Sequence, residues 1–237
     1  DEDYERTIQA RAFDVVRYFL PLAVRTSLGQ VLTLRVLERQ IRRMLGSNTE
    51  ELQDIGKALR DMCGVAPDQT WGALHGLPPS EAPLAPTLVR HCDPTPYQSQ
   101  TYAALREAID TILTDYGLTN AGEWPTVERV ELMPPHSPEH EVLTTLLYRV
   151  THAPYRFILE QVQRMSAHTH ATILELAHRH RGPHDDLLKE FNCGYALIYD
   201  ILMDLGAWRD LHRHRRCQQI RQDFTPLHGF ETPPLLT

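Results

Sequence analysis

The sequence lacks any apolar run long enough to cross a membrane, and its Asp1-Glu2-Asp3 start shows no signal-peptide pattern. We therefore expect no membrane partner. The first residue is also not methionine, which favours a piece of a longer protein or a processed chain. In size, 237 residues are enough for one large domain or two small ones with a real hydrophobic core.

The sequence contains few cysteines, and they are far apart along the chain. The four cysteines, Cys63, Cys92, Cys193 and Cys217, are widely scattered and form no C-x-x-C pair. Free thiols in a reducing cytoplasm are the simplest interpretation, so we expect a cytoplasmic protein. Neither Cys193 nor Cys217 has a neighbouring base that would make it a convincing nucleophile.

Positive charge is scarce overall but concentrated in one place. The net charge of −7 argues against binding to a nucleic-acid polymer. Yet residues 208–216, WRDLHRHRR, hold four arginines and two histidines directly after an apolar run, Tyr195 to Leu205. Guanidinium groups donate bidentate hydrogen bonds to phosphate oxygens, so this cluster predicts a site for a phosphate-bearing ligand. The alternative is a solvated basic face.

Hydrophobic periodicity predicts mostly helices. We expect helices near residues 6–20, 34–45, 49–62, 97–116, 139–151, 155–168 and 171–180. Extended segments are expected near 24–33 and 127–133, whereas 195–204 fits either a strand or a buried helix. Seven prolines mark 64–96 as a linker or irregular excursion. The expected fold is α/β (α+β), dominated by helices with a small central sheet.

Two segments resemble one enzyme family. The first is Val16-Arg17-Tyr18-Phe19-Leu20-Pro21, followed by Thr26 and then by Arg35 and Leu37. It is similar, without a gap, to the Arg-x-x-Leu-Pro, Thr and Asn-Ala-Arg-Ser-Leu pattern of the flavin-dependent (alternative) thymidylate synthases. The second is Arg213-His214-Arg215, which resembles the start of that family's Arg-His-Arg-x-x-Ser-x-Asn-Glu-x-Ser-x-Arg signature. Residues 127–133 resemble its opening strand.

The order of the two segments is reversed relative to the family, in which the Arg-His-Arg half comes first. This predicts either part of a tandem protein, with the end of one copy followed by the start of the next, or a circular permutation. Under both hypotheses residues 1–63 resemble the C-terminal half of the synthase domain and residues 97–237 the N-terminal half. Residues 64–96 are then the proline-rich connector.

The resemblance implies an activity and a set of ligands. Such enzymes methylate dUMP to dTMP with methylenetetrahydrofolate, using FAD as hydride carrier and NADPH as reductant, and no protein nucleophile. It further implies that Arg213, His214 and Arg215 contact phosphates of FAD or dUMP, that Arg35 helps to hold the flavin and that Arg17 reaches dUMP. Because the family places its active sites between subunits, we expect a homo-oligomer.

The chain departs from the family signature after Arg215. The Ser, Asn, Glu, Ser and Arg positions hold Gln218, Ile220, Arg221, Asp223 and Thr225, and Thr33 and Leu34 replace the family's Asn and Ala. The alternative function is therefore a catalytically degenerate repeat that serves as an assembly module or binds a nucleotide or another anion.

Other polar residues suggest further, weaker possibilities. Five histidines, at positions 168, 170, 178, 180 and 184, precede the apolar run; His170 and His178 can share a helical face as a metal pair, although no H-E-x-x-H spacing is present. The dipeptide His184-Asp185 is similar to the paired ligand of HD phosphohydrolases. Asp200 and Asp204 are predicted to orient Arg209 or Arg213 through ion pairs, and Tyr195 and Tyr199 to be core aromatics.

Overall fold

The structure is a computed structural model that describes residues 2–20, 25, 27–76, 78–119, 124 and 128–229, except for the side chains of residues 17 and 71. The chain divides into two compact units. The smaller comprises residues up to Leu32 together with those from Pro226 onward, and the larger comprises Thr33–Thr225. Each is described by itself.

The smaller unit contains one long helix, as the sequence predicts. Helix α1 spans Glu2–Val16 and is followed by the 3-10 turn η1, Arg17–Phe19; η4 spans Pro226–His228. None of the described α1 side chains is buried. The predicted strand at 24–33 is wrong for residues 25 and 27–33, which have no regular structure, while 24 and 26 lie outside the described residues. Val31 is fully exposed and pairs with no described strand. The preference of valine for strands depends on packing against neighbouring strands, which none of the described strands provides here.

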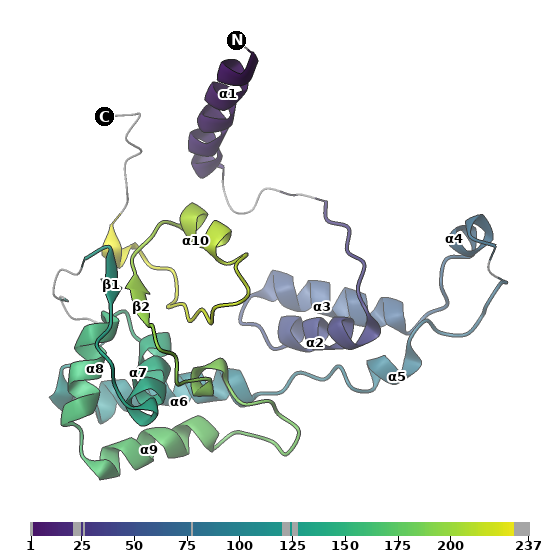
Figure 1. Cartoon of the computed structure of the whole chain (residues 1–237). Helices are drawn as coiled ribbons and strands as arrows, with labels where there is room; N and C mark the ends of the chain where they lie inside the picture. The colour runs from purple at the N-terminus through teal and green to yellow at the C-terminus, as the bar shows by residue number, and fades with distance from the viewer. Residues whose placement is uncertain are drawn as a thin grey trace. The chain divides into compact units, whose positions relative to one another are not determined.

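The first half of the larger unit is a helix pair with two short helices. Helix α2 spans Leu34–Leu45, α3 Glu50–Cys63, α4 Gln69–Leu74 and α5 Pro86–Val89. The predicted helices at 34–45 and 49–62 are thus confirmed. The prediction of a linker at 64–96 is wrong in part, because the stretch contains α4 and α5 and buries Ala85, Leu88 and Cys92 against Ile41 and Cys63. Helices α2 and α3 lie side by side (Figure 1). Gly56 permits their close approach, since a Cβ there would lie 2.9 Å from Cβ of Met44.

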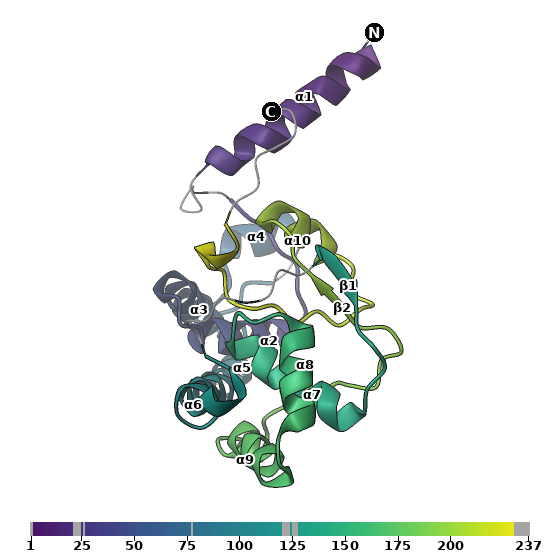
Figure 2. The same ribbon diagram turned by 90° about the vertical axis from the view of Figure 1, so that its left-hand side faces the viewer.

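The second half of the larger unit is a helical body. It comprises α6 (Tyr97–Thr111), η2 (Thr114–Tyr116), α7 (Pro138–Val150), α8 (Tyr155–Arg164), α9 (Ala167–His178), η3 (Lys189–Phe191) and α10 (Leu205–Leu211). Helices α6, α7, α8 and α9 pack around the main core, where Leu105, Leu143 and Leu146 are fully buried (Figures 1 and 2). Ser137 and Ser166 cap α7 and α9, each accepting a backbone N–H with its hydroxyl. The cap at Ser137 accords with the predicted start of α7, but the predicted boundary between 155–168 and 171–180 is wrong: α8 ends at Arg164 and the Ser166 cap starts α9 at Ala167.

A two-stranded antiparallel sheet lies beside this body. Strand β1 (Val130–Leu132) pairs with β2 (Tyr199–Ile201), and Glu131 lies opposite Asp200. The prediction of a helix-dominated α/β chain with a small sheet is confirmed at this level. The sheet is not central, however, because Val130 and Leu132 are about half exposed. Two strands of three residues each leave one face uncovered, and the third predicted strand did not form.

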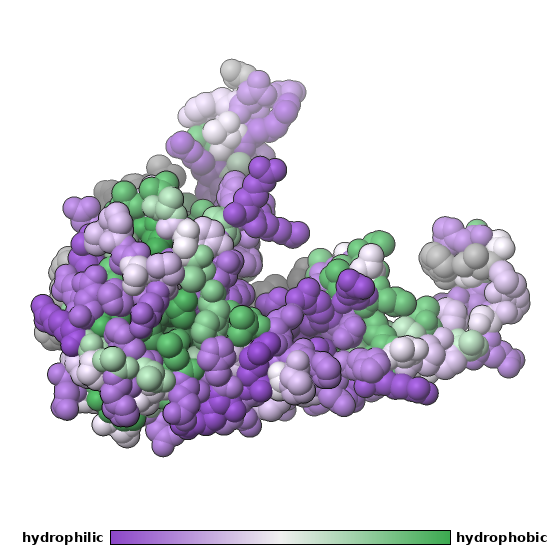
Figure 3. Space-filling model, turned by 60° about the horizontal axis from the view of Figure 1, so that its bottom comes forward, coloured by the Kyte–Doolittle hydropathy of each residue, from purple (hydrophilic) through white to green (hydrophobic). Residues whose placement is uncertain are grey.

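Apolar side chains reach the surface of the larger unit in several places, as the face in Figure 3 shows. Within the described part of the chain, no helix is both long enough and apolar enough to pass through a bilayer. Scattered exposed apolar residues are normal for a folded surface.

Candidate functional site

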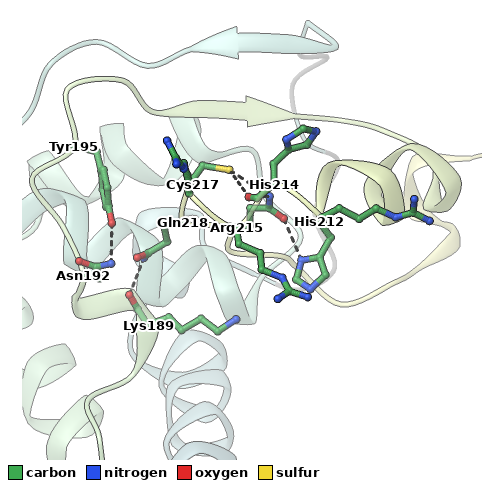
Figure 4. A pocket seen from close by; sticks show the side chains of 11 residues that line it. Lys189, Asn192, Tyr195, His212, His214, Arg215, Cys217 and Gln218 are labelled. Carbon is green, nitrogen blue, oxygen red and sulfur yellow. Dashed lines mark hydrogen bonds between the residues drawn. The ribbon is translucent and has the colours of Figure 1, made fainter. Parts of the chain in front are cut away.

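The arginine cluster forms one wall of a basic hollow. The hollow has a volume of about 640 Å³ and is built from two segments of the larger unit that are distant in sequence (Figure 4). Its lining residues are Lys189, Asn192, Tyr195, His212, Arg213, His214, Arg215, Arg216, Cys217, Gln218 and Gln219. The first three come from η3 and the chain after it, and the others from the loop that follows α10.

Helix α10 places the loop. Asp204 caps the helix, its Oδ1 accepting the N–H groups of Gly206 at 2.7 Å and of Ala207 at 3.0 Å. The helix ends after Leu211, where a turn begins in which the His214 N–H donates to the carbonyl of Leu211. The loop that follows this short helix and turn carries the basic residues that line the hollow.

Two glutamines hold the loop in shape. The side-chain amide of Gln219 donates to the carbonyl oxygens of Leu211 at 2.9 Å and His214 at 3.3 Å, and its Oε1 lies 3.1 Å from Nδ1 of His212. The side-chain amide of Gln218 donates to the carbonyl of Lys189 at 2.7 Å, which joins the two segments that line the hollow (Figure 4). The loop therefore has an internal scaffold independent of any ligand.

The hollow carries a strong excess of positive charge. Four lining residues, Lys189, Arg213, Arg215 and Arg216, are cations at neutral pH, and the lining includes no aspartate or glutamate. Arg213 has a partner outside the lining, Asp210 at 3.7 Å, but both side chains are largely exposed, so the pair contributes little. Lys189 and Arg215 extend toward the same side of the hollow as the ring of His212 (Figure 4).

The pKa of Lys189 is lowered, first by burial and then by arginines that lie outside the lining of the hollow. Partial desolvation of its ammonium group lowers the pKa, and the positive charges of Arg43, Arg149 and Arg221 lower it further against the opposing effect of Glu190. A bound anion would relieve the repulsion. The arrangement suits an anion with several oxygens, and phosphate is the group that guanidinium forks match best.

The structure brings together three of the five site residues predicted from sequence. Arg213, His214 and Arg215 all line the hollow. Arg35 lies exposed in the first turn of α2 and is not one of the lining residues. Arg17 begins η1 in the smaller unit, and its side chain lies outside the described part of the structure.

Sequence analysis missed the second wall of the hollow. Lys189 and Asn192 carried no recognisable pattern, and Tyr195 was predicted to be a core aromatic. That prediction is wrong, since Tyr195 is 44% exposed and its hydroxyl accepts from the side-chain amide of Asn192 at 2.7 Å. Tyr199 is also exposed, because it lies on the uncovered side of the sheet. Only tertiary contact joins this segment to residues 212–219.

The predicted ion pair of Asp200 with an arginine is also wrong. Asp200 Oδ1 accepts the hydroxyl of Tyr148 at 2.9 Å, and its Oδ2 accepts the backbone N–H of Tyr155 at 2.8 Å, at the start of α8. The side chain points from the sheet toward the helices, where an arginine from the loop does not reach. Asp200 therefore links strand β2 to helices α7 and α8 through two hydrogen bonds.

The histidines have separate partners. Nε2 of His170 lies 2.9 Å from the carbonyl of Val162, and its Nδ1 lies 3.2 Å from Glu139. The His178 ring packs 4.6 Å from that of Phe191. Asp185 of the His-Asp dipeptide accepts the N–H of Gly182 at 2.9 Å. Among the residues that the structure describes, no group of three metal-ligating side chains is placed to hold an ion.

Comparison with known proteins finds distant relatives. The chain is 24% identical over 246 residues to a UPF0159 protein of Chlamydia muridarum, covering 98% of this chain and 41% of the relative. It is 25% identical over 238 residues to a UPF0159 protein of Chlamydia pneumoniae, covering 97% of this chain and 40% of the relative. The chain thus spans about two fifths of the length of the curated relatives it matches. No protein-family model matches the chain, and no solved structure does.

Proposed function

We propose that the chain is a flavin-dependent thymidylate synthase-like protein whose basic hollow holds phosphate groups of FAD or dUMP. The observation that carries this proposal is that Lys189, Arg213, Arg215 and Arg216 all line one hollow, with no carboxylate among its described lining residues. Such a donor set fits a phosphate or diphosphate group.

The chain's own part in the reaction would be binding and orientation. Arg213, His214 and Arg215 would hold the anionic ligands, and Lys189 would add a further positive group from the other segment of the lining. Bound FAD supplies the hydride-transfer chemistry, with NADPH as reductant and methylenetetrahydrofolate as one-carbon donor. Positioned cations reduce the entropy cost of bringing such ligands together.

The arrangement of the whole protein is part of the proposal. More than half the length of each relative lies outside the aligned region. That is enough length for further synthase-like sequence, in keeping with a tandem origin for the reversed order of segments. We further propose a homo-oligomer of the synthase fold, and light scattering on the purified chain tests it: a strict monomer would contradict it.

A second candidate function is a degenerate repeat that binds an anion without catalysis. Two departures from the family signature favour it, because both residues are engaged within the fold. The Arg221 guanidinium lies 4.1 Å from the ring centroid of Phe224 and 5.2 Å from that of Trp208. Asp223 forms ion pairs with Arg106 and Arg149. Residues used in this way are not free to contact a substrate.

Flavin binding tests the shared part of both proposals. The purified chain mixed with FAD and passed through gel filtration should retain visible flavin absorption. Arg215→Gln should reduce the retained flavin about tenfold or more, since it removes a charge-assisted contact. Arg209→Gln is the matched control: it removes the same charge from the neighbouring α10, outside the hollow. Absence of FAD binding by the wild-type chain would refute the flavin-binding proposal and leave only another anion as a ligand for the hollow.

Turnover then separates the two candidates. Tritium release from labelled dUMP, measured with methylenetetrahydrofolate, FAD and NADPH present, should accompany flavin binding if the chain is an active synthase. Flavin binding without tritium release would favour the degenerate repeat.

A further inference from the structure

Residues 218–223 run from the basic hollow to the helical body, and each end is attached to different elements. We name this segment the strap. At the hollow, the side-chain amide of Gln219 donates to the carbonyl of Leu211, and that of Gln218 donates to the carbonyl of Lys189. These contacts control the distance between the two walls that carry the cations.

The other end of the strap is attached to helices α6 and α7 and to the connection between α7 and α8. The side-chain amide of Gln222 donates to the carbonyl of Ala153, between α7 and α8, at 2.8 Å. Asp223 Oδ2 accepts from Arg106 of α6 at 2.8 Å, and Oδ1 accepts from Arg149 of α7 at 2.9 Å. One carboxylate therefore joins two helices to the strap with one oxygen each.

The surroundings of Asp223 favour its charged form. Burial acts to raise the pKa of Asp223, but the hydrogen bond and charge of Arg149, with the charges of Arg106 and Arg221, outweigh it and hold the pKa below its usual value. Arg149 is the less exposed partner, with 19% of its side chain accessible compared with 37% for Arg106.

We propose that Asp223 is a positioning residue for the basic hollow, anchoring the strap so that Gln218 and Gln219 hold Lys189 and the arginine loop at a spacing that binds an anion. The inference rests on the proposed function, because it concerns the affinity of that hollow. Asp223 itself does not line the hollow. Its effect passes through the strap.

The sign of the effect distinguishes positioning from simple electrostatics. Replacing a carboxylate by an amide removes a negative charge, which by Coulomb's law should strengthen anion binding slightly. Loss of the anchor should instead weaken it, because part of the binding free energy must then be spent on ordering the loop. The two accounts predict opposite changes in affinity for one substitution.

The test is calorimetric titration of the full chain with inorganic pyrophosphate. Asp223→Asn should weaken pyrophosphate binding about fivefold to tenfold, and Asp223→Glu should recover most of the loss. Asp54→Asn is the matched control, because it removes a carboxylate paired with Lys57 on α3, away from the strap, and should leave affinity equal or slightly higher. Should Asp223→Asn fail to fold, Gln222→Ala removes the strap's hydrogen bond to the carbonyl of Ala153 without changing any charge, and should weaken binding about twofold to threefold.

Amide hydrogen exchange supplies a local readout. In Asp223→Asn, residues 212–220 should exchange faster while α7 and α8 keep their protection, and pyrophosphate should restore protection of the loop. Unchanged or tighter pyrophosphate binding by Asp223→Asn would overturn the positioning role and leave the proposed function standing. A wild-type chain that binds neither pyrophosphate nor FAD would overturn the proposed function itself.

Discussion

Replacement of Asp200 by alanine tests how the small sheet is held to the helices. The substitution removes two acceptors at once, one for the Tyr148 hydroxyl and one for the Tyr155 N–H. A hydrogen bond to a charged group contributes about 1.5–3 kcal/mol when buried and less when partly solvated. Asp200 is half-buried. Two such bonds would contribute about 3–6 kcal/mol if fully buried, and because Asp200 is partly solvated we expect Asp200→Ala to lower the free energy of unfolding by less, about 2 kcal/mol.

Urea denaturation followed by far-UV circular dichroism measures this loss. Tyr148→Phe is the control, since it removes one partner of Asp200 and leaves the Tyr155 N–H bonded; about 1 kcal/mol is expected. The double variant should lose less than the sum of the two single losses, because both remove the same Tyr148 contact. Pyrophosphate affinity should not change in Asp200→Ala. A loss below about 0.5 kcal/mol, which is typical of a surface substitution, would refute the inferred role.

Three further predictions concern the core, alkaline pH and the hollow. Leu146→Ala, at a fully buried position, should lower the free energy of unfolding by about 3 kcal/mol in urea denaturation, and a loss below about 1 kcal/mol would contradict the described core. Burial raises the pKa of Tyr155 to about 12, so the folded state keeps a proton that the unfolded chain loses near its ordinary pKa of about 10. The contribution of Tyr155 to the free energy of unfolding should be fully present below about pH 10 and should decline as the pH rises toward about 12. Urea denaturation midpoints measured at successive pH values in this range should therefore fall less steeply in Tyr155→Phe than in the wild-type chain. Cys217, exposed in the hollow, should react with a thiol reagent much faster than the buried Cys92, and pyrophosphate should slow the Cys217 reaction; equal rates with and without the anion would count against binding in the hollow.

The helices of this chain were largely predictable from local sequence. Apolar residues at helical spacing indicated α2, α3 and α6–α9, and the proline-rich stretch marked the irregular connection between the two halves of the larger unit. These signals are local, because a helix satisfies its backbone hydrogen bonds within its own segment. Helices α4, α5 and α10 were missed, since their six, four and seven residues carry too few turns for a clear period.

Strands were predicted less well, for a physical reason. A strand forms only against a partner, so residues 25 and 27–33, which include the β-branched Val31 and Thr33, remained irregular, whereas 199–201 became a strand by pairing with 130–132. The prediction that Asp200 pairs with an arginine failed in the same way. Which helix lies behind a strand depends on long-range packing and not on spacing along the chain.

The sequence by itself determined the local concentration of charge, and hence that an anion site, if present, would involve residues 213–215. Tertiary structure alone decided the rest of the site. It placed Lys189 opposite the arginines, left Arg35 outside the lining, and gave Arg221 and Asp223 partners within the fold. Charge density is a property of neighbouring residues in a chain, whereas a binding hollow requires distant segments to meet. That meeting depends here on the packing of the helical body and the hydrogen bonds of Gln218 and Gln219.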